Sequence, residues 1–74
     1  MDINSKSDDL WTSLHCSAFN GHLSVVEYLV NHGAEINAKN NENLTPLHYS
    51  DSFGFQSVVE YLLIHGAEPL WVMY

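Results

Sequence analysis

One stretch of this sequence occurs twice: residues 24–35 read S-V-V-E-Y-L-V-N-H-G-A-E, and residues 57–68 read S-V-V-E-Y-L-L-I-H-G-A-E. The copies lie 33 residues apart and agree at ten of twelve positions. The same offset relates four further pairs, namely Thr12 and Thr45, Leu14 and Leu47, His15 and His48, and Gly21 and Gly54. A repeat with a period in this range predicts stacked copies of one supersecondary unit.

The first helix of each unit is marked by its caps. In the first unit we predict a helix over residues 12–20, with the Thr12 hydroxyl capping an early helical N–H. Gly21 ends it, because glycine tolerates the left-handed backbone found there. In the second unit Thr45 takes the cap position and Pro46 the first helical position, where a missing N–H costs nothing.

The second helix of each unit carries the apolar stripe. In the first unit it is predicted over residues 23–31, with Ser24 and Glu27 as a capping box and Gly33 at its end. The polar residues 34–43 then form a turn. Across both units we predict a core made of ten side chains: Leu14, Val25, Val26, Leu29, Val30, Leu47, Val58, Val59, Leu62 and Leu63. One unit cannot hide its apolar face alone, so the units must stack.

Composition limits the partners and the compartment. The 74 residues carry a formal net charge of −7, with only Lys6 and Lys39 as basic residues. Nucleic acids and anionic membranes are bound through Lys and Arg clusters, so we expect neither, and a basic protein surface is favoured. The single Cys16 excludes an internal disulfide, and no signal-peptide core or apolar run of ~18 residues is found. We therefore expect an intracellular, cytoplasmic protein.

The motif T-S-L-H-C-S-A-F-N-G-H, followed by V-V-E-Y-L-V and G-A-E-I-N-A, resembles the ankyrin repeat. The second unit matches again with T-P-L-H-Y-S-D-S-F-G-F, V-V-E-Y-L-L and G-A-E-P, so the resemblance covers residues 7–69. It implies an all-α solenoid of two stacked helix–turn–helix units joined by a hairpin-like turn. It also implies that His48 hydrogen-bonds a neighbouring turn. The predicted division is a polar leader (1–9), two repeats (10–39 and 40–69) and an apolar tail (70–74).

Two departures from the family pattern affect the expected geometry. Leu10 and Asn43 stand where a turn glycine is usual. Asparagine tolerates a left-handed backbone and leucine does not, so we predict that the first turn is incomplete. Asp51 replaces a small packed alanine, which predicts that the first helix of the second unit is distorted or lies at a solvent-facing end.

By resemblance, partners bind the turn tips and the exposed side of the first helices. The matching positions are Asp8, Asp9, Trp11, Phe19, Asn20, Asn41, Glu42, Leu44, Ser52 and Phe53. Exposed aromatic side chains inside an acidic rim suit the anchor residues of a protein interface. The alternative is that Trp11 and Phe19 only shield the uncovered N-terminal end of the stack.

Other chemistry finds little support in this sequence. Two histidine pairs, His15 with His48 and His32 with His65, recur once per unit, which indicates a structural role and no metal site. Cys16 lacks an orienting group, a phosphate loop is absent, and we expect neither an enzyme nor a cofactor. Asn37, with Leu29 eight residues before it and Glu35 two before it, resembles the sites at which ankyrin repeats are hydroxylated, in a host that has the hydroxylase.

Two hypotheses of function follow. The first is a protein-interaction module with a concave acidic and aromatic surface. The second is a truncated fragment of a longer array without independent activity. In that case the tail residues Leu70, Trp71, Val72 and Tyr74 would mediate self-association. If the chain is instead a short gene product, the same tail would have to cover the open end, by folding back or by contacting another chain.

Overall fold

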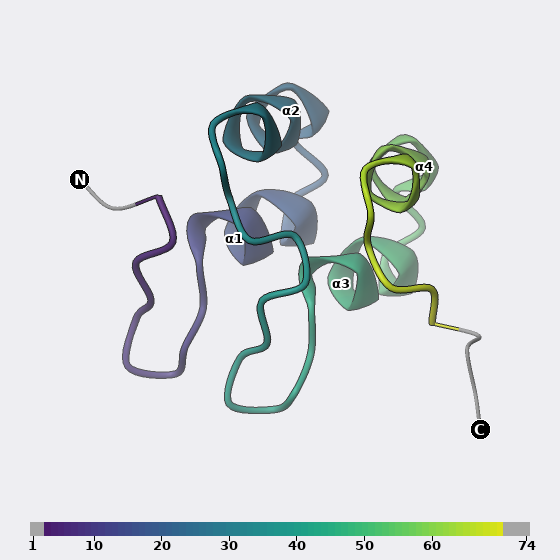
Figure 1. The fold of residues 1–74 in the computed structure, drawn as a ribbon. Coiled ribbons are helices and arrows are strands. Elements are labelled where there is room, and N and C mark those ends of the chain that lie inside the picture. Colours follow the sequence, from purple (N-terminus) through teal and green to yellow (C-terminus); the bar gives the residue numbers. More distant parts are fainter. Residues whose placement is uncertain (1–2, 71–74) are drawn as a thin grey trace.

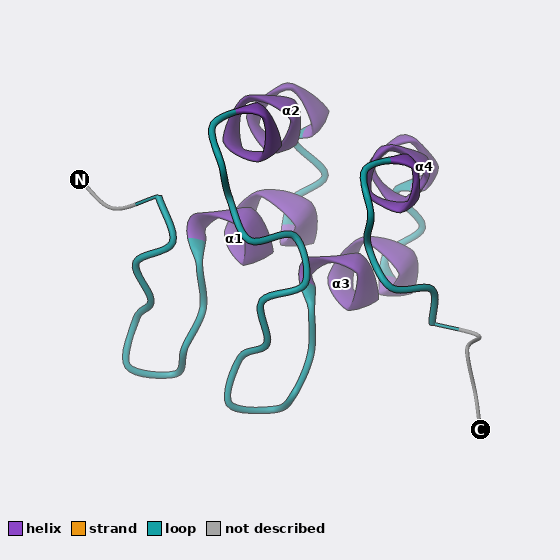
Figure 2. Cartoon of the chain, in the orientation of Figure 1, coloured by secondary structure: helices purple, strands orange, loops and turns teal. Residues whose placement is uncertain are grey.

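The computed structural model describes residues 3–70. It contains four helices, α1 (Ser13–Phe19), α2 (Leu23–Asn31), α3 (Pro46–Ser52) and α4 (Gln56–Ile64), and residues 3–70 contain no strand. The two helix pairs stack in the same orientation, with α1 beside α3 and α2 beside α4, and a long turn projects before each pair (Figures 1 and 2). The predicted all-α class is confirmed. Trp71, Val72 and Tyr74 lie outside the described residues.

The short helices α1 and α3 form because a threonine and a histidine cap the N-terminus of each. The His15 N–H donates to Thr12 Oγ1 at 3.2 Å, and the Thr12 N–H donates to His15 Nδ1 at 3.1 Å. Thr45 and His48 take the same positions in α3: the Thr45 N–H donates to His48 Nδ1 at 3.0 Å, and the His48 N–H donates to the Thr45 carbonyl at 3.1 Å. The predicted threonine caps are therefore right, and histidine completes each of them.

The box predicted from Ser24 and Glu27 is wrong. Helix α2 begins at Leu23, directly after its N-cap His22, and no side chain caps it. Ser24 therefore lies inside the first turn of the helix. From that position its hydroxyl comes too late in the chain to close the helix end, which explains the missing bond.

The core lies in the contact between the two units, which we call the seam. Leu14, Val26, Leu47, Val58 and Leu62 are buried as predicted, whereas Val25 is 45% exposed and that assignment is wrong. Val25 and Val58 are equivalent positions of the two units. Val58 is buried because the first unit covers it, and among the described residues nothing covers Val25 in that way. Leu29, Val30, Val59 and Leu63 are partly buried against the same cluster.

The first turn is complete, contrary to the prediction. Leu10 adopts the left-handed backbone with φ 67°, matching Asn43 with φ 66° in the second turn. The Leu10 N–H donates to the Ser7 carbonyl at 2.8 Å, and the Asn41 N–H donates to the Asp9 carbonyl at 3.0 Å, which ties the two turns together. These bonds offset the steric cost that leucine brings to this conformation.

Asp51 settles the choice left open for α3. The side chain is exposed, and α3 is seven residues long, as α1 is. The helix therefore keeps its shape, and Asp51 lies on a solvent-facing end of the stack. The equivalent Ala18 is fully buried in the seam.

Two asparagines fasten the ends of the outer helices. Asn37 donates to the Gly66 carbonyl at 3.1 Å and accepts from the Glu68 N–H at 2.8 Å. Asn4 makes the equivalent bonds one unit earlier, to the Gly33 carbonyl and from the Glu35 N–H. Each asparagine thus satisfies backbone groups of the loop that follows an outer helix.

Gly21 and Gly54 form a matched pair for testing the seam. Both have positive φ, 70° and 74°, so an alanine costs ~1–2 kcal/mol at either position. A Cβ at Gly21 would lie 2.8 Å from the Phe55 ring, whereas at Gly54 it meets nothing within 4 Å. We expect Gly21→Ala to lower the free energy of unfolding by about 1–3 kcal/mol more than Gly54→Ala, measured in urea. Equal losses would show that Phe55 does not press on Gly21.

Candidate partner-binding face

Four aromatic rings meet across the seam and form what we call the aromatic face: Trp11, Phe19, Tyr49 and Phe53. Ring centroids are 4.6 Å apart for Trp11 and Tyr49, 5.6 Å for Phe19 and Tyr49, and 4.8 Å for Phe19 and Phe53. The Phe19–Phe53 pair is edge-to-face, an arrangement that aromatic rings prefer, and the other two pairs are tilted. The rings come from both units, so the face exists only when the units are stacked.

The aromatic face is only partly covered. Phe19 is 40% exposed and Phe53 is 51% exposed, while Trp11 and Tyr49 are half-buried. Rings held by one another and still open to solvent can make contact with a partner at small entropic cost, because their positions are already fixed.

Tyr49 is fixed by the turn that precedes it. Asn40 is 4% exposed, and its Nδ2 donates to Tyr49 Oη at 2.7 Å. Asn40 Oδ1 accepts from the N–H groups of Glu42 and Leu44, both at 3.0 Å. One buried amide therefore sets the position of an aromatic ring and of an acidic turn tip together.

His15 joins the units beneath the aromatic face. Its ring is fully buried, and Nε2 lies 2.9 Å from the Leu44 carbonyl of the second turn. Because Nδ1 accepts from the Thr12 N–H, the neutral ring carries its proton on Nε2 and donates it to Leu44. The resemblance implied this bond for His48. Among the described residues His15 makes it, and His48 bonds Thr45 at the start of its own helix.

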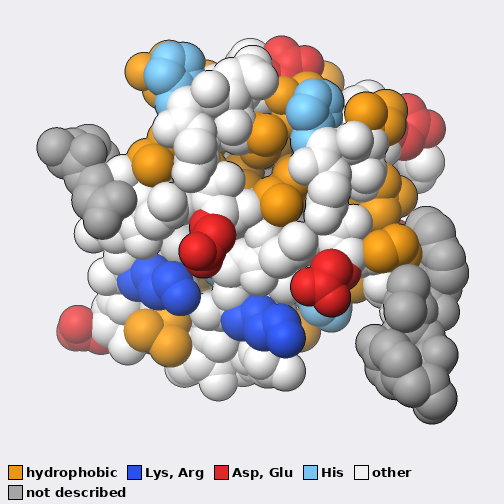
Figure 3. Space-filling view, viewed as in Figure 1, with side chains coloured by type: hydrophobic (Ala, Val, Ile, Leu, Met, Phe, Trp, Pro, Cys, Tyr) orange, Lys and Arg blue, Asp and Glu red, His pale blue; other side chains and the backbone are white. Residues whose placement is uncertain are grey.

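The turn tips give the face its charge. Asp8, Asp9 and Glu42 are exposed there together with Asn41, and the Ser7 hydroxyl donates to the Asp9 carboxylate. The cations of residues 3–70 are Lys6 and Lys39, which occupy equivalent places in the two turns. Figure 3 shows both lysines on one side of the molecule, among single acidic side chains.

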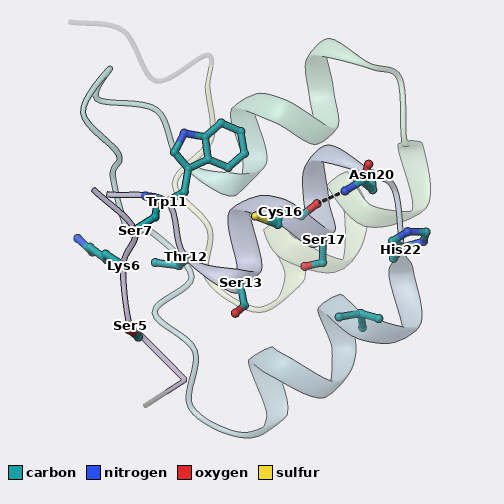
Figure 4. A pocket seen from close by; sticks show the side chains of 11 residues that line it. Ser5, Lys6, Ser7, Trp11, Thr12, Ser13, Cys16, Ser17, Asn20 and His22 are labelled. Carbon is teal, nitrogen blue, oxygen red and sulfur yellow. Dashed lines mark hydrogen bonds between the residues drawn. The ribbon is translucent and has the colours of Figure 1, made fainter. Parts of the chain in front are cut away.

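The structure brings together only part of the predicted contact set. Phe19 contacts both Trp11 and Phe53, and Ser52 is exposed beside Phe53 in the chain. Leu44 is half-buried, with its backbone engaged in the seam. Asn20 turns back and donates to the Cys16 carbonyl at 2.9 Å, on the outer side of α1 (Figure 4). The packing of Phe19 on Tyr49 and Phe53 directs it toward the seam rather than toward the N-terminal end.

Tyr49 is the member of the aromatic face that the sequence analysis missed. It stands where the first unit has Cys16, at a position treated as variable. Its spacing of four residues from Phe53 was the available signal, since such positions share one side of a helix. Asn4 was missed in the same way, although Ile3-Asn4 matches Ile36-Asn37 at the same 33-residue offset.

A family model described as ankyrin repeats (3 copies) matches residues 1–70. The chain belongs to the ankyrin-repeat family. Ankyrin repeats generally mediate protein–protein interaction, and the four helices and the two turns described above are the parts of two such repeats.

Two relatives contain stretches similar to this chain. Over 33 residues, 45% of the chain, it is 48% identical to ankyrin repeat domain-containing protein 49 of Bos taurus, and covers 14% of that protein. Over 35 residues, 47% of the chain, it is 45% identical to alpha-latrocrustotoxin-Lt1a of Latrodectus tredecimguttatus, and covers 2% of it. The chain thus spans a small part of the length of each relative.

The structure also places the residues that were considered for metal binding, for thiol chemistry and for hydroxylation. Within residues 3–70 no three His, Cys, Asp or Glu side chains converge as a metal site would require, and no helix is long and apolar enough to cross a membrane. Cys16 is free and exposed. Asn37 is half-buried with its amide bonded at both ends, so a hydroxylase would need this ankyrin turn to open; its modification stays a prediction.

Acid should weaken this ankyrin seam through His15. Burial is the main reason that the pKa of His15 lies below its ordinary 6.5; the Lys6 charge adds to it, and the Leu44 and Ala38 carbonyls oppose it. Below pH 6.5 the unfolded chain therefore binds a proton at His15 that the folded chain does not bind. We expect the free energy of unfolding to be complete above pH 6.5 and to fall below it, until the folded pKa is reached.

His15→Gln provides the comparison. The variant should lose about 1–3 kcal/mol at neutral pH, because it disturbs the bonds to Thr12 and Leu44, and it should also lose that part of the pH slope. Urea unfolding over a pH series measures both effects. An unchanged slope in His15→Gln would contradict the assignment.

Proposed function

We propose that this chain is a non-enzymatic, cytoplasmic protein-interaction module that binds a partner segment across the aromatic face. The observation that supports the proposal is the cluster of four rings across the seam, with Phe19 and Phe53 still 40% and 51% exposed. Packing alone would favour covering such rings. A prearranged apolar patch on a rigid stack suits the central anchor of an interface.

The charge distribution supports a basic partner. The chain carries −7 overall, and in the turns near the face Asp8, Asp9 and Glu42 outnumber Lys6 and Lys39. Such a rim speeds the approach of a positive surface and disfavours an acidic one. An Arg or Lys side chain can also lie on an open ring face of Phe19 or Phe53, which adds about 0.5–1 kcal/mol at an exposed site. The proposed ligand is therefore a peptide segment with an apolar residue beside basic ones.

The test begins with a displayed peptide library, selected on the full chain, followed by titration of the selected peptide against variants. Phe53→Ala should weaken binding by tenfold or more, about 1.4 kcal/mol or more, as expected for an anchor residue. Phe19→Ala should act in the same direction. Rising salt should weaken the affinity, because the acidic rim is screened.

Ile64→Ala is the matched control. This side chain is equally apolar and 79% exposed, but it lies at the end of α4, outside the aromatic face. Circular dichroism checks that all variants keep their helices. If Phe53→Ala and Ile64→Ala bind the peptide equally well, the aromatic face is not the binding surface and Phe19 and Phe53 only pack the seam.

A further inference from the structure

The two ends of the stack differ in chemistry, although the units share one register. The second unit covers the first with aromatic rings. At the equivalent positions, on the outer side of α1 and α2, the first unit has small or polar side chains. Three pairs show the difference: Cys16 for Tyr49, Asn20 for Phe53, and His22 for Phe55. All three first-unit residues are exposed, and with Ser13 and Ser17 they line an open hollow whose wall also includes Trp11 and Val25 (Figure 4). This end therefore lacks the three rings with which the second unit covers the first.

The opposite end is apolar and open. Leu47, Val59, Leu63 and Leu70 line a hollow of about 300 Å³, with Asp51 as its one charged group. In the first unit the equivalent Leu14 and Val26 are buried, and Val30 is partly buried against the same cluster. Val59 is thus partly exposed where the equivalent Val26 is fully buried in the seam.

We infer that residues 71–74 of this chain dock in that hollow and close the end of the stack. The segment reads W-V-M-Y and carries no charged side chain. It follows Leu70, which is itself a wall of the hollow, and four residues reach up to ~13 Å. Figure 1 shows the chain after α4 descending to the level of α3 before this segment begins.

The register of the repeat directs the first residue of the segment inward. Trp71 stands 33 residues after Ala38, and Ala38 is 3% exposed, packed beneath the seam. A chain that continues the same path brings position 71 to the equivalent place at the open end. Among the described residues nothing covers that place as the second unit covers Ala38, so a side chain larger than a methyl group has room there.

The exposed Asp51 carboxylate disfavours a larger occupant of the hollow, such as another helical unit or a second copy of the chain. Another helical unit would bury this carboxylate as the second unit buries Ala18, and an unpaired buried carboxylate is costly. Two copies meeting at this end would enclose two such carboxylates. Head-to-tail stacking would instead meet the polar outer side of α1, which lacks the rings that cover the seam. A short attached segment leaves Asp51 solvated and has an effective concentration near the millimolar range.

The test uses the full chain with Trp11→Phe, which leaves Trp71 as the one tryptophan. We expect Trp71 emission shifted to the blue and protected from acrylamide. Leu63→Ser should move the emission toward that of free indole and raise quenching severalfold. Ile64→Ser, one residue on and 79% exposed, should change neither.

Three results would overturn the inference. The first is emission like that of free indole in the Trp11→Phe chain. The second is equal quenching in Leu63→Ser and Ile64→Ser. The third is protection that disappears on dilution together with a fall in sedimentation rate, which would assign the hollow to a second copy. Should Leu63→Ser lose its helices, Trp71→Ala serves in its place: it should lower the melting temperature, and an unchanged value would also reject docking. The outcome does not depend on peptide binding at the aromatic face.

Discussion

The structure depends on one buried hydrogen bond, from His15 Nε2 of the first unit to the Leu44 carbonyl of the second. The same ring accepts the Thr12 N–H, so helix α1 is capped by the residue that also crosses the seam. Around it lie Leu14, Leu47 and the other side chains of the core cluster. Each unit is too small to bury its apolar side alone, and folding is therefore a property of the pair. The aromatic face inherits this dependence, because its rings come from both units.

Translation by one unit explains which positions are buried. In such a stack every helix has a leading and a trailing side, and only one of them meets the other unit. Val58 is 1% exposed and Val25 is 45% exposed for this reason, although they are the same position of the repeat. Ala18 and Asp51 differ in the opposite sense. The two ends therefore differ: Cys16, Asn20 and His22 lie with the exposed Val25 at one end, and an apolar hollow lies beside Asp51 at the other.

Much of the fold could be read from the sequence, because the 33-residue offset, the threonine caps and the turn glycines are local signals. The exposure of Val25 could not, since a helical pattern does not tell which unit is missing a neighbour. The left-handed Leu10 was also beyond reach: its cost is local, while the bonds that offset it, such as Asn41 to Asp9, connect two turns. For the face, the family pattern placed Trp11, Phe19 and Phe53 in one predicted contact set, whereas finding Tyr49 required the spatial register of α3 against α1.

Amide hydrogen exchange tests the central claim that the seam makes the two units one cooperative structure. Under conditions in which exchange reports the opening equilibrium, the helical amides of α1 and α3 should share one free energy of opening, and His15→Gln should lower it equally in both helices. If the amides of α1 open at a markedly lower free energy than those of α3, or if the substitution affects α1 alone, the units fold separately and the account is contradicted.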